Sequence, residues 1–174
     1  MSYQFQLTVP IRSHFKKMVA KRHIVEPFKL SSGRCHYSQI FFGNLHKNYI
    51  KAKPKHPDYF NTHLTIEFNS DLSRENRFYW DAQTVNSIDK ALESLFNDKL
   101  FTYLDDHAQG KGDIQNGIIK FMECYAITED DIKLDSLKKK YYRYRTNQEK
   151  HDKRNFRALA ENQNSFENQS PPTN

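Results

Sequence analysis

The chain has 174 residues, a formal net charge of +6 and a pI near 9.2. This length suits one domain, or one domain with a small appendage and a tail. Hydrophobic residues make up 37% and aromatic residues 14% of the chain, which excludes a fully disordered protein because such proteins are poor in aromatic rings. The excess of cations favours a polyanionic partner such as nucleic acid.

The chain contains no sequence motif for metal binding, cofactor binding, secretion or membrane insertion. Cys35 and Cys124 lie in no CxxC or Cys/His spacing, so we expect no metal site, and we expect Cys124 to be a buried thiol within a helix. The five glycines form no phosphate-binding loop, and we therefore expect no cofactor. Residues 1–10 lack signal-peptide features and no apolar segment reaches membrane-spanning length, which predicts a cytoplasmic protein without a membrane partner.

The N-terminal part, residues 1–80, predicts an α+β fold with a small antiparallel sheet and one or two helices. Residues 5–9 alternate apolar and polar side chains, as a half-buried strand does, and Pro10 follows them. Residues 63–68 give the clearest strand, and we expect the two strands to pair. Residues 13–22 predict a basic helix that buries Phe15, Met18 and Val19.

Two segments between these elements are less regular. Residues 36–48 fit either a short helix or a strand, since a short apolar run does not decide between them. Residues 51–57 contain two prolines and several charges, which predict a loop.

The helical part, residues 81–146, predicts three helices. Apolar residues recur at helical spacing from Thr84 to Asp105, and again from Ile114 to Tyr125 after a break at residues 110–112. Thr128 looks like the N-cap of the third helix, with Asp131 at the capping-box position. Its apolar stripe is Leu134, Leu137, Tyr141 and Tyr144. The polar composition of residues 147–174 predicts a disordered tail.

The end of the third helix is the best candidate for a binding site. Cations and aromatic rings alternate there, and cations neutralise phosphates while rings stack on bases. Tyr141 and Tyr144 belong to the apolar stripe and are expected in the core. The predicted nucleic-acid-binding residues are Lys138, Lys139, Lys140, Tyr142, Arg143 and Arg145, with Lys16, Lys17, Lys21 and Arg22 of the N-terminal helix as a second anchor. Lys150, Lys153, Arg154 and Arg157 extend the positive stretch.

Residues 121–145, from Phe121 through the Tyr125-Ala126-Ile127-Thr128 turn to Arg145, resemble helix-turn-helix segments of small prophage and mobile-element proteins. The resemblance implies a bacterial or phage origin and DNA as the first partner to test. Residues 129–131 are acidic and depart from a usual recognition helix, because carboxylates repel phosphates. The cations at the far end of the helix suit contact with the DNA backbone.

Two functions remain open on the sequence. The first is a non-catalytic DNA-binding protein of a mobile element or phage. The second is a protein-interaction module, in which Tyr142 and the arginines bind an acidic partner or a second copy of the chain. His36-Tyr37-Ser38 and His63-Leu64-Thr65 match the His-x-Ser/Thr pattern of phosphoesterases that place two histidines on strands, but we interpret the match as chance. No catalytic residue is predicted.

Overall fold

The structure is a computed structural model, and it describes residues 4–21, 26–29, 36–43, 59–69, 82–107 and 114–167. Within these ranges the chain forms a three-stranded sheet and five helices, which confirms the predicted α+β class. The chain divides into two compact units, residues 1–134 and residues 135–174. The sheet and four of the described helices lie in the first unit, and all but the first residue of the last helix lies in the second.

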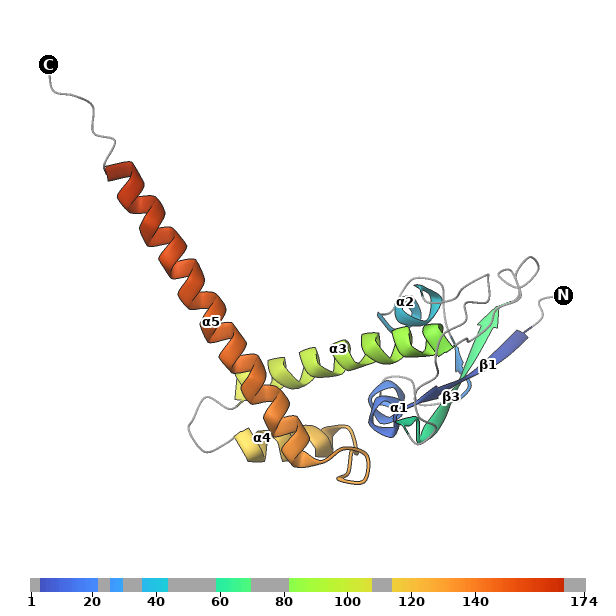
Figure 1. The fold of residues 1–174 in the computed structure, drawn as a ribbon. Helices are drawn as coiled ribbons and strands as arrows, with labels where there is room; N and C mark the ends of the chain where they lie inside the picture. Colours follow the sequence, from blue (N-terminus) through green and yellow to red (C-terminus); the bar gives the residue numbers. More distant parts are fainter. Residues whose placement is uncertain are drawn as a thin grey trace, which may run out of the picture. The chain divides into compact units, whose positions relative to one another are not determined.

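The sheet is built around the strand that the sequence predicts best. β3 (Thr62–Asn69) pairs antiparallel with β1 (Gln4–Ile11) (Figure 1). In this register Val9 lies opposite Leu64. This confirms the predicted pairing. β2 (Phe28–Lys29) pairs with β3 in the parallel direction, so the sheet is mixed, with order β1-β3-β2. Pro10 lies inside β1, which its position at the edge of the sheet tolerates.

The helices of the first unit pack through aromatic rings. α1 (Ser13–Ala20) buries the predicted Phe15, Met18 and Val19, and α3 (Ala82–His107) is the predicted long helix. The Phe96 ring of α3 lies 5.9 Å from that of Phe15 and 5.6 Å from that of Phe121, with edge-to-face geometry. Such contacts add about 0.5–1.5 kcal/mol each beyond their buried area.

α2 (His36–Gly43) resolves the ambiguous segment in favour of a helix. Its Tyr37 and Phe41 are buried, and their rings lie 6.5 Å and 6.4 Å from the ring of Phe28. The two rings are four residues apart and therefore share one face of the helix. The loop predicted at residues 51–57 and the break at residues 110–112 lie outside the described residues.

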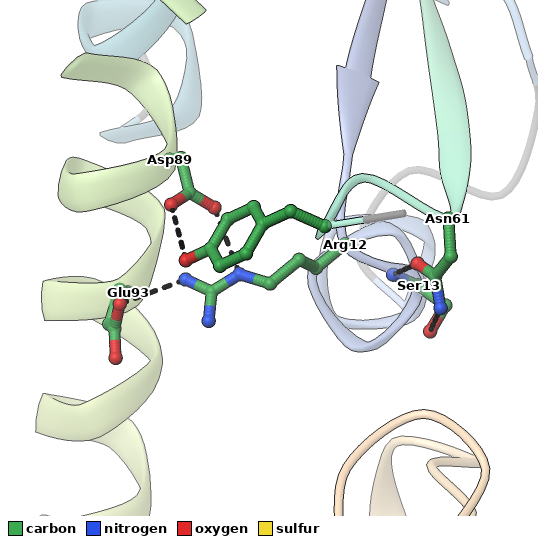
Figure 2. A network of polar contacts seen from close by, with 6 residues as sticks. Arg12, Ser13, Asn61, Asp89 and Glu93 are labelled. Carbon is green, nitrogen blue, oxygen red and sulfur yellow. Dashed lines mark hydrogen bonds and ion pairs between the residues drawn. The ribbon is translucent and has the colours of Figure 1, made fainter. Parts of the chain in front are cut away.

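A polar network joins the start of α1 to α3 (Figure 2). The Arg12 guanidinium donates from Nε to Asp89 at 2.9 Å and from Nη2 to Glu93 at 2.9 Å, and the Tyr59 hydroxyl donates to Asp89 at 3.0 Å. Asp89 is 1% exposed, so its charge depends on these donors. The side chain of Asn61, just before β3, accepts from the backbone N–H of Ser13 at 2.8 Å and caps α1.

α4 (Ile114–Cys124) buries the predicted Ile118, Phe121 and Met122, and it ends in a Schellman motif. The N–H of Ile127 donates to the Met122 carbonyl at 2.9 Å, and the N–H of Ala126 donates to the Glu123 carbonyl at 3.0 Å. Ala126 has φ of 52°, the left-handed conformation that glycine usually occupies there.

α5 (Leu134–Glu167) differs from the predicted third helix at both ends. It begins at Leu134, and Thr128 to Asp131 form a turn before it, in which the Asp131 carboxylate accepts from the N–H and the hydroxyl of Thr128. The predicted capping box therefore does not start a helix. At the other end α5 includes residues 147–167, where a disordered tail was predicted. No glycine or proline interrupts Leu134–Glu167, which allows one continuous helix.

Candidate nucleic-acid interface

One face of α5 carries a row of exposed cations. Lys139, Arg143, Lys150 and Arg154 are all exposed, and steps of four, seven and four residues keep them on the same side of a helix. Leu137 and Tyr141, which are buried, lie on the roughly opposite side. With a rise of 1.5 Å per residue, the row is about 22 Å long. We call these four residues the cationic row.

No carboxylate is paired with the cationic row among the described residues. Glu149 and Asp152 lie on other sides of the helix, by roughly 110° and 170° from the centre of the row, whereas the exposed Asp135 lies one turn before Lys139, about 70° from that centre. Among the residues that the structure describes, no member of the row forms an ion pair. The row therefore presents its charge to solvent.

The structure divides the predicted residues of α5 into two groups. Lys139, Tyr142 and Arg143 are exposed, and Tyr142 retains 49% of its surface. Lys138 and Lys140 are half-buried, and Arg145, although exposed, donates from Nη1 to the Tyr141 hydroxyl at 3.5 Å. Helical geometry places these three cations nearer the buried stripe than the cationic row is. Tyr141 is buried, as predicted.

Lys150 and Arg154, which the sequence predicts only as an extension of the positive stretch beyond Arg145, lie on the same face as Lys139 and Arg143. The signal that identifies them is their spacing from Arg143, which continues the same face. Tyr144 is half-buried rather than fully buried.

The second predicted anchor is engaged inside the first unit. Lys16 pairs with Glu26 at 3.0 Å and also donates to the His63 carbonyl at 2.9 Å. Lys17 pairs with Asp131 at 2.5 Å. These contacts hold loops and strands to α1, so they compete with any contact to a phosphate. Arg22 lies outside the described residues.

Lys21 is engaged in the same way. Its ammonium group donates to the Cys124 carbonyl and lies 4.7 Å from the centre of the Tyr125 ring. Cys124 itself is exposed, so the prediction of a buried thiol is wrong. It occupies the last position of α4, off the face that carries Ile118 and Phe121.

The turn before α5 has an unusually acidic carboxyl group. Partial burial raises the pKa of Asp131, but contacts with Lys17, Ser13 and Thr128 lower it by more, to about 2. The acidic residues that the sequence placed at the start of a recognition helix therefore precede α5, and one of them is neutralised by α1. Residues 125–133 separate α4 from α5, a longer connection than the three to four residues typical of a helix-turn-helix.

The histidine motifs do not form a pair of strand-borne groups. His63 lies on β3, but His36 begins the helix α2. In the described ranges, no group of three or more His, Cys, Asp or Glu side chains is placed to hold a metal ion. None of the described helices combines the length and the apolar character that crossing a membrane requires. Comparison of the chain with protein-family models, with curated proteins and with solved structures gives no match.

Proposed function

We propose that this protein binds DNA without catalysis, and that the cationic row of α5 contacts the phosphates. The observation that carries the proposal is the alignment of Lys139, Arg143, Lys150 and Arg154 on one exposed face. Binding releases the counterions that these phosphates hold, so affinity depends steeply on salt. Contacts of this kind position a protein on DNA and do not read its sequence.

The proposal differs from the expected one in two respects. It assigns no role to Lys16, Lys17 and Lys21, because each already has a partner within the first unit. It also does not depend on a helix-turn-helix, since an isolated cationic helix face suffices for backbone contact. A mobile-element or phage origin stays part of the proposal on the resemblance of residues 121–145.

The test compares two variants that each lose three positive charges. One is Lys139→Gln/Arg143→Gln/Lys150→Gln, and the control is Lys90→Gln/Lys120→Gln/Lys133→Gln, whose three lysines are exposed on the first unit. Fluorescence anisotropy with duplex and single-stranded DNA over a salt series measures both affinity and its salt dependence.

Each lost phosphate contact lowers the slope of log K against log salt by about 0.9 for duplex DNA. Three lost contacts reduce the slope by about 2.7, which is roughly a 500-fold loss of affinity near 0.1 M salt. The control variant is expected to keep the wild-type slope. Equal losses of affinity in both variants would show that the net charge, and not the cationic row, determines DNA binding. Absence of binding by the wild-type protein at low salt would contradict DNA binding altogether.

A second candidate function is protein interaction through α5. Phe156 is 72% exposed and Tyr142 is 49% exposed, and exposed aromatic rings are typical anchors of interfaces. In this case α5 binds an acidic protein or a second copy of the chain. Sedimentation velocity of the wild-type protein and of Phe156→Ser tests whether the chain forms a dimer through this ring. A dimer in the wild type that dissociates in the variant would support this function.

A further inference from the structure

A hollow of about 520 Å³ lies among the end of α1, the second half of α3 and the end of α4. All of its lining residues belong to the first unit. Its volume falls within the range of small-molecule sites, about 300–1,000 Å³. It is separate from the cationic row, so an occupant of the hollow does not depend on the proposed DNA binding.

Aromatic rings form the base and sides of the hollow. The Phe121 ring is 1% exposed, and the rings of Tyr103 and Tyr125 lie 5.7 Å and 4.9 Å from it, tilted by 59° and 50°. The parallel pair, Tyr103 and His107, is already in contact at 4.2 Å and leaves no slot for a flat ligand. Tilted ring faces suit a cation, because each face carries partial negative charge, and they suit an aliphatic chain, because the rings are apolar.

The Lys21 ammonium shows this preference within the protein itself. It lies over the Tyr125 ring at 4.7 Å and donates to the Cys124 carbonyl, so a ring at the rim already holds a cation. Lys99, the other lysine of the lining, also has an interaction within the protein. Neither lysine is therefore a ready site for an anionic ligand.

Two carboxylates in the lining form no ion pair with its two lysines or with any other described residue. Asp98 and Asp106 are exposed, and among the described residues neither forms a hydrogen bond or an ion pair. They share one ridge of α3 with Thr102 between them, since residues four and eight positions apart lie on the same face. Eight residues separate them by about 12 Å along the helix axis.

We propose that this hollow binds a linear aliphatic diamine or polyamine. One ammonium group pairs with Asp98 and another with Asp106, and the methylene chain between them lies against the ring of Tyr103, which is half-buried. Two carboxylates about 12 Å apart on one ridge of a hollow that aromatic rings also line match an extended dication better than a single cation.

Isothermal titration calorimetry of the full chain without DNA tests this proposal. Spermidine and a series of diamines of increasing chain length are compared with two ligands that have one ammonium group each. One is butylamine, and the other is Nα-acetyl-lysine amide, whose free side-chain ammonium represents a lysine of a protein. We expect affinity to pass through a maximum along the diamine series. Butylamine and the lysine amide are expected to bind at least fivefold more weakly than the best diamine, since each lacks one of the two charge contacts.

Variants locate the site. Asp98→Asn and Asp106→Asn are each expected to weaken the best diamine about three- to fivefold, the effect of one exposed charge contact. Asp105→Asn is the matched control, because Asp105 is exposed on the same helix but does not line the hollow. Tyr103→Leu keeps apolar bulk without the ring, and it is expected to weaken binding two- to fivefold.

Several results would overturn the proposal. They are no detectable binding by the wild-type protein, equal affinity for butylamine and the diamines, or equal losses in Asp105→Asn and the two lining variants. Binding of the lysine amide as tight as that of the best diamine would instead assign the hollow to a protein partner. The ligand comparison uses the wild-type protein, so it remains decisive if a variant fails to fold.

Discussion

Replacing Asp89 with asparagine is expected to destabilise the first unit strongly. The carboxylate is 1% exposed and accepts from Arg12 (Figure 2). It also accepts from the Tyr59 hydroxyl. The substitution keeps the shape of the side chain but removes its charge. Arg12, whose side chain is 15% exposed, then loses its most buried partner.

The magnitude follows from what remains around Arg12. Breaking a buried ion pair by removing one charge costs about 3–5 kcal/mol. Here the guanidinium keeps Glu93 at 2.9 Å, and it still lies 4.2 Å and 5.1 Å from the rings of Phe15 and Tyr59. We therefore expect the lower end of the range, about 3 kcal/mol of unfolding free energy.

Urea unfolding followed by circular dichroism measures this loss, with the midpoint and the slope reported separately. Glu93→Gln is the control, and it is expected to cost less than about 1 kcal/mol because its side chain is 32% exposed. A loss below about 1 kcal/mol for Asp89→Asn would refute the reasoning, as would equal losses in the two variants. Arg12→Met/Asp89→Leu is expected to be more stable than Asp89→Asn, since no uncompensated charge stays buried.

Two further predictions concern the turn between α4 and α5. Asp131 has its pKa lowered to about 2 from 3.8, so its contribution to stability is full above pH 4 and is lost as the pH falls towards 2. Asp131→Asn is expected to cost about 2 kcal/mol at pH 7 and almost nothing at pH 2, and a constant difference in urea unfolding at both pH values would contradict this. Ala126→Gly is expected to raise the unfolding free energy by about 0.5–1 kcal/mol, because Ala126 holds a left-handed conformation. The control Ala20→Gly, in the last turn of α1, is expected to lower it by a similar amount, and a loss in both variants would refute the argument.

The elements that the sequence predicts well are those with a long, regular pattern. β1 and β3 alternate over several residues, and α3 keeps its apolar stripe over many turns. In each case one face is buried against the same core, so local pattern and tertiary packing agree. β2 has two residues beside Pro27 and no alternation, so its parallel pairing with β3 depends on contacts distant in the chain.

The start of α5 shows a different limit. Thr128 and Asp131 have the residue types and the spacing of a capping box, and the Asp131 carboxylate does accept from the N–H of Thr128. The same carboxylate also binds Lys17, which lies 114 residues away in sequence. A local motif therefore reports the hydrogen bond correctly without fixing whether a helix follows it.

The candidate interface, too, could be predicted only in part, because local sequence does not show which cations have partners elsewhere in the chain. The lysines of α1 and the cations of α5 look alike in the sequence, yet Lys16, Lys17 and Lys21 have partners on other elements of the first unit. What distinguishes Lys139, Arg143, Lys150 and Arg154 is a period that keeps them away from the buried stripe, and none of them forms an ion pair among the described residues. The lysines of α1 contribute to the net charge of +6, but they already have contacts within the protein and are therefore less able to bind a polyanion. The length of the cationic row, rather than the turn that precedes it, is therefore the property on which phosphate binding is expected to depend.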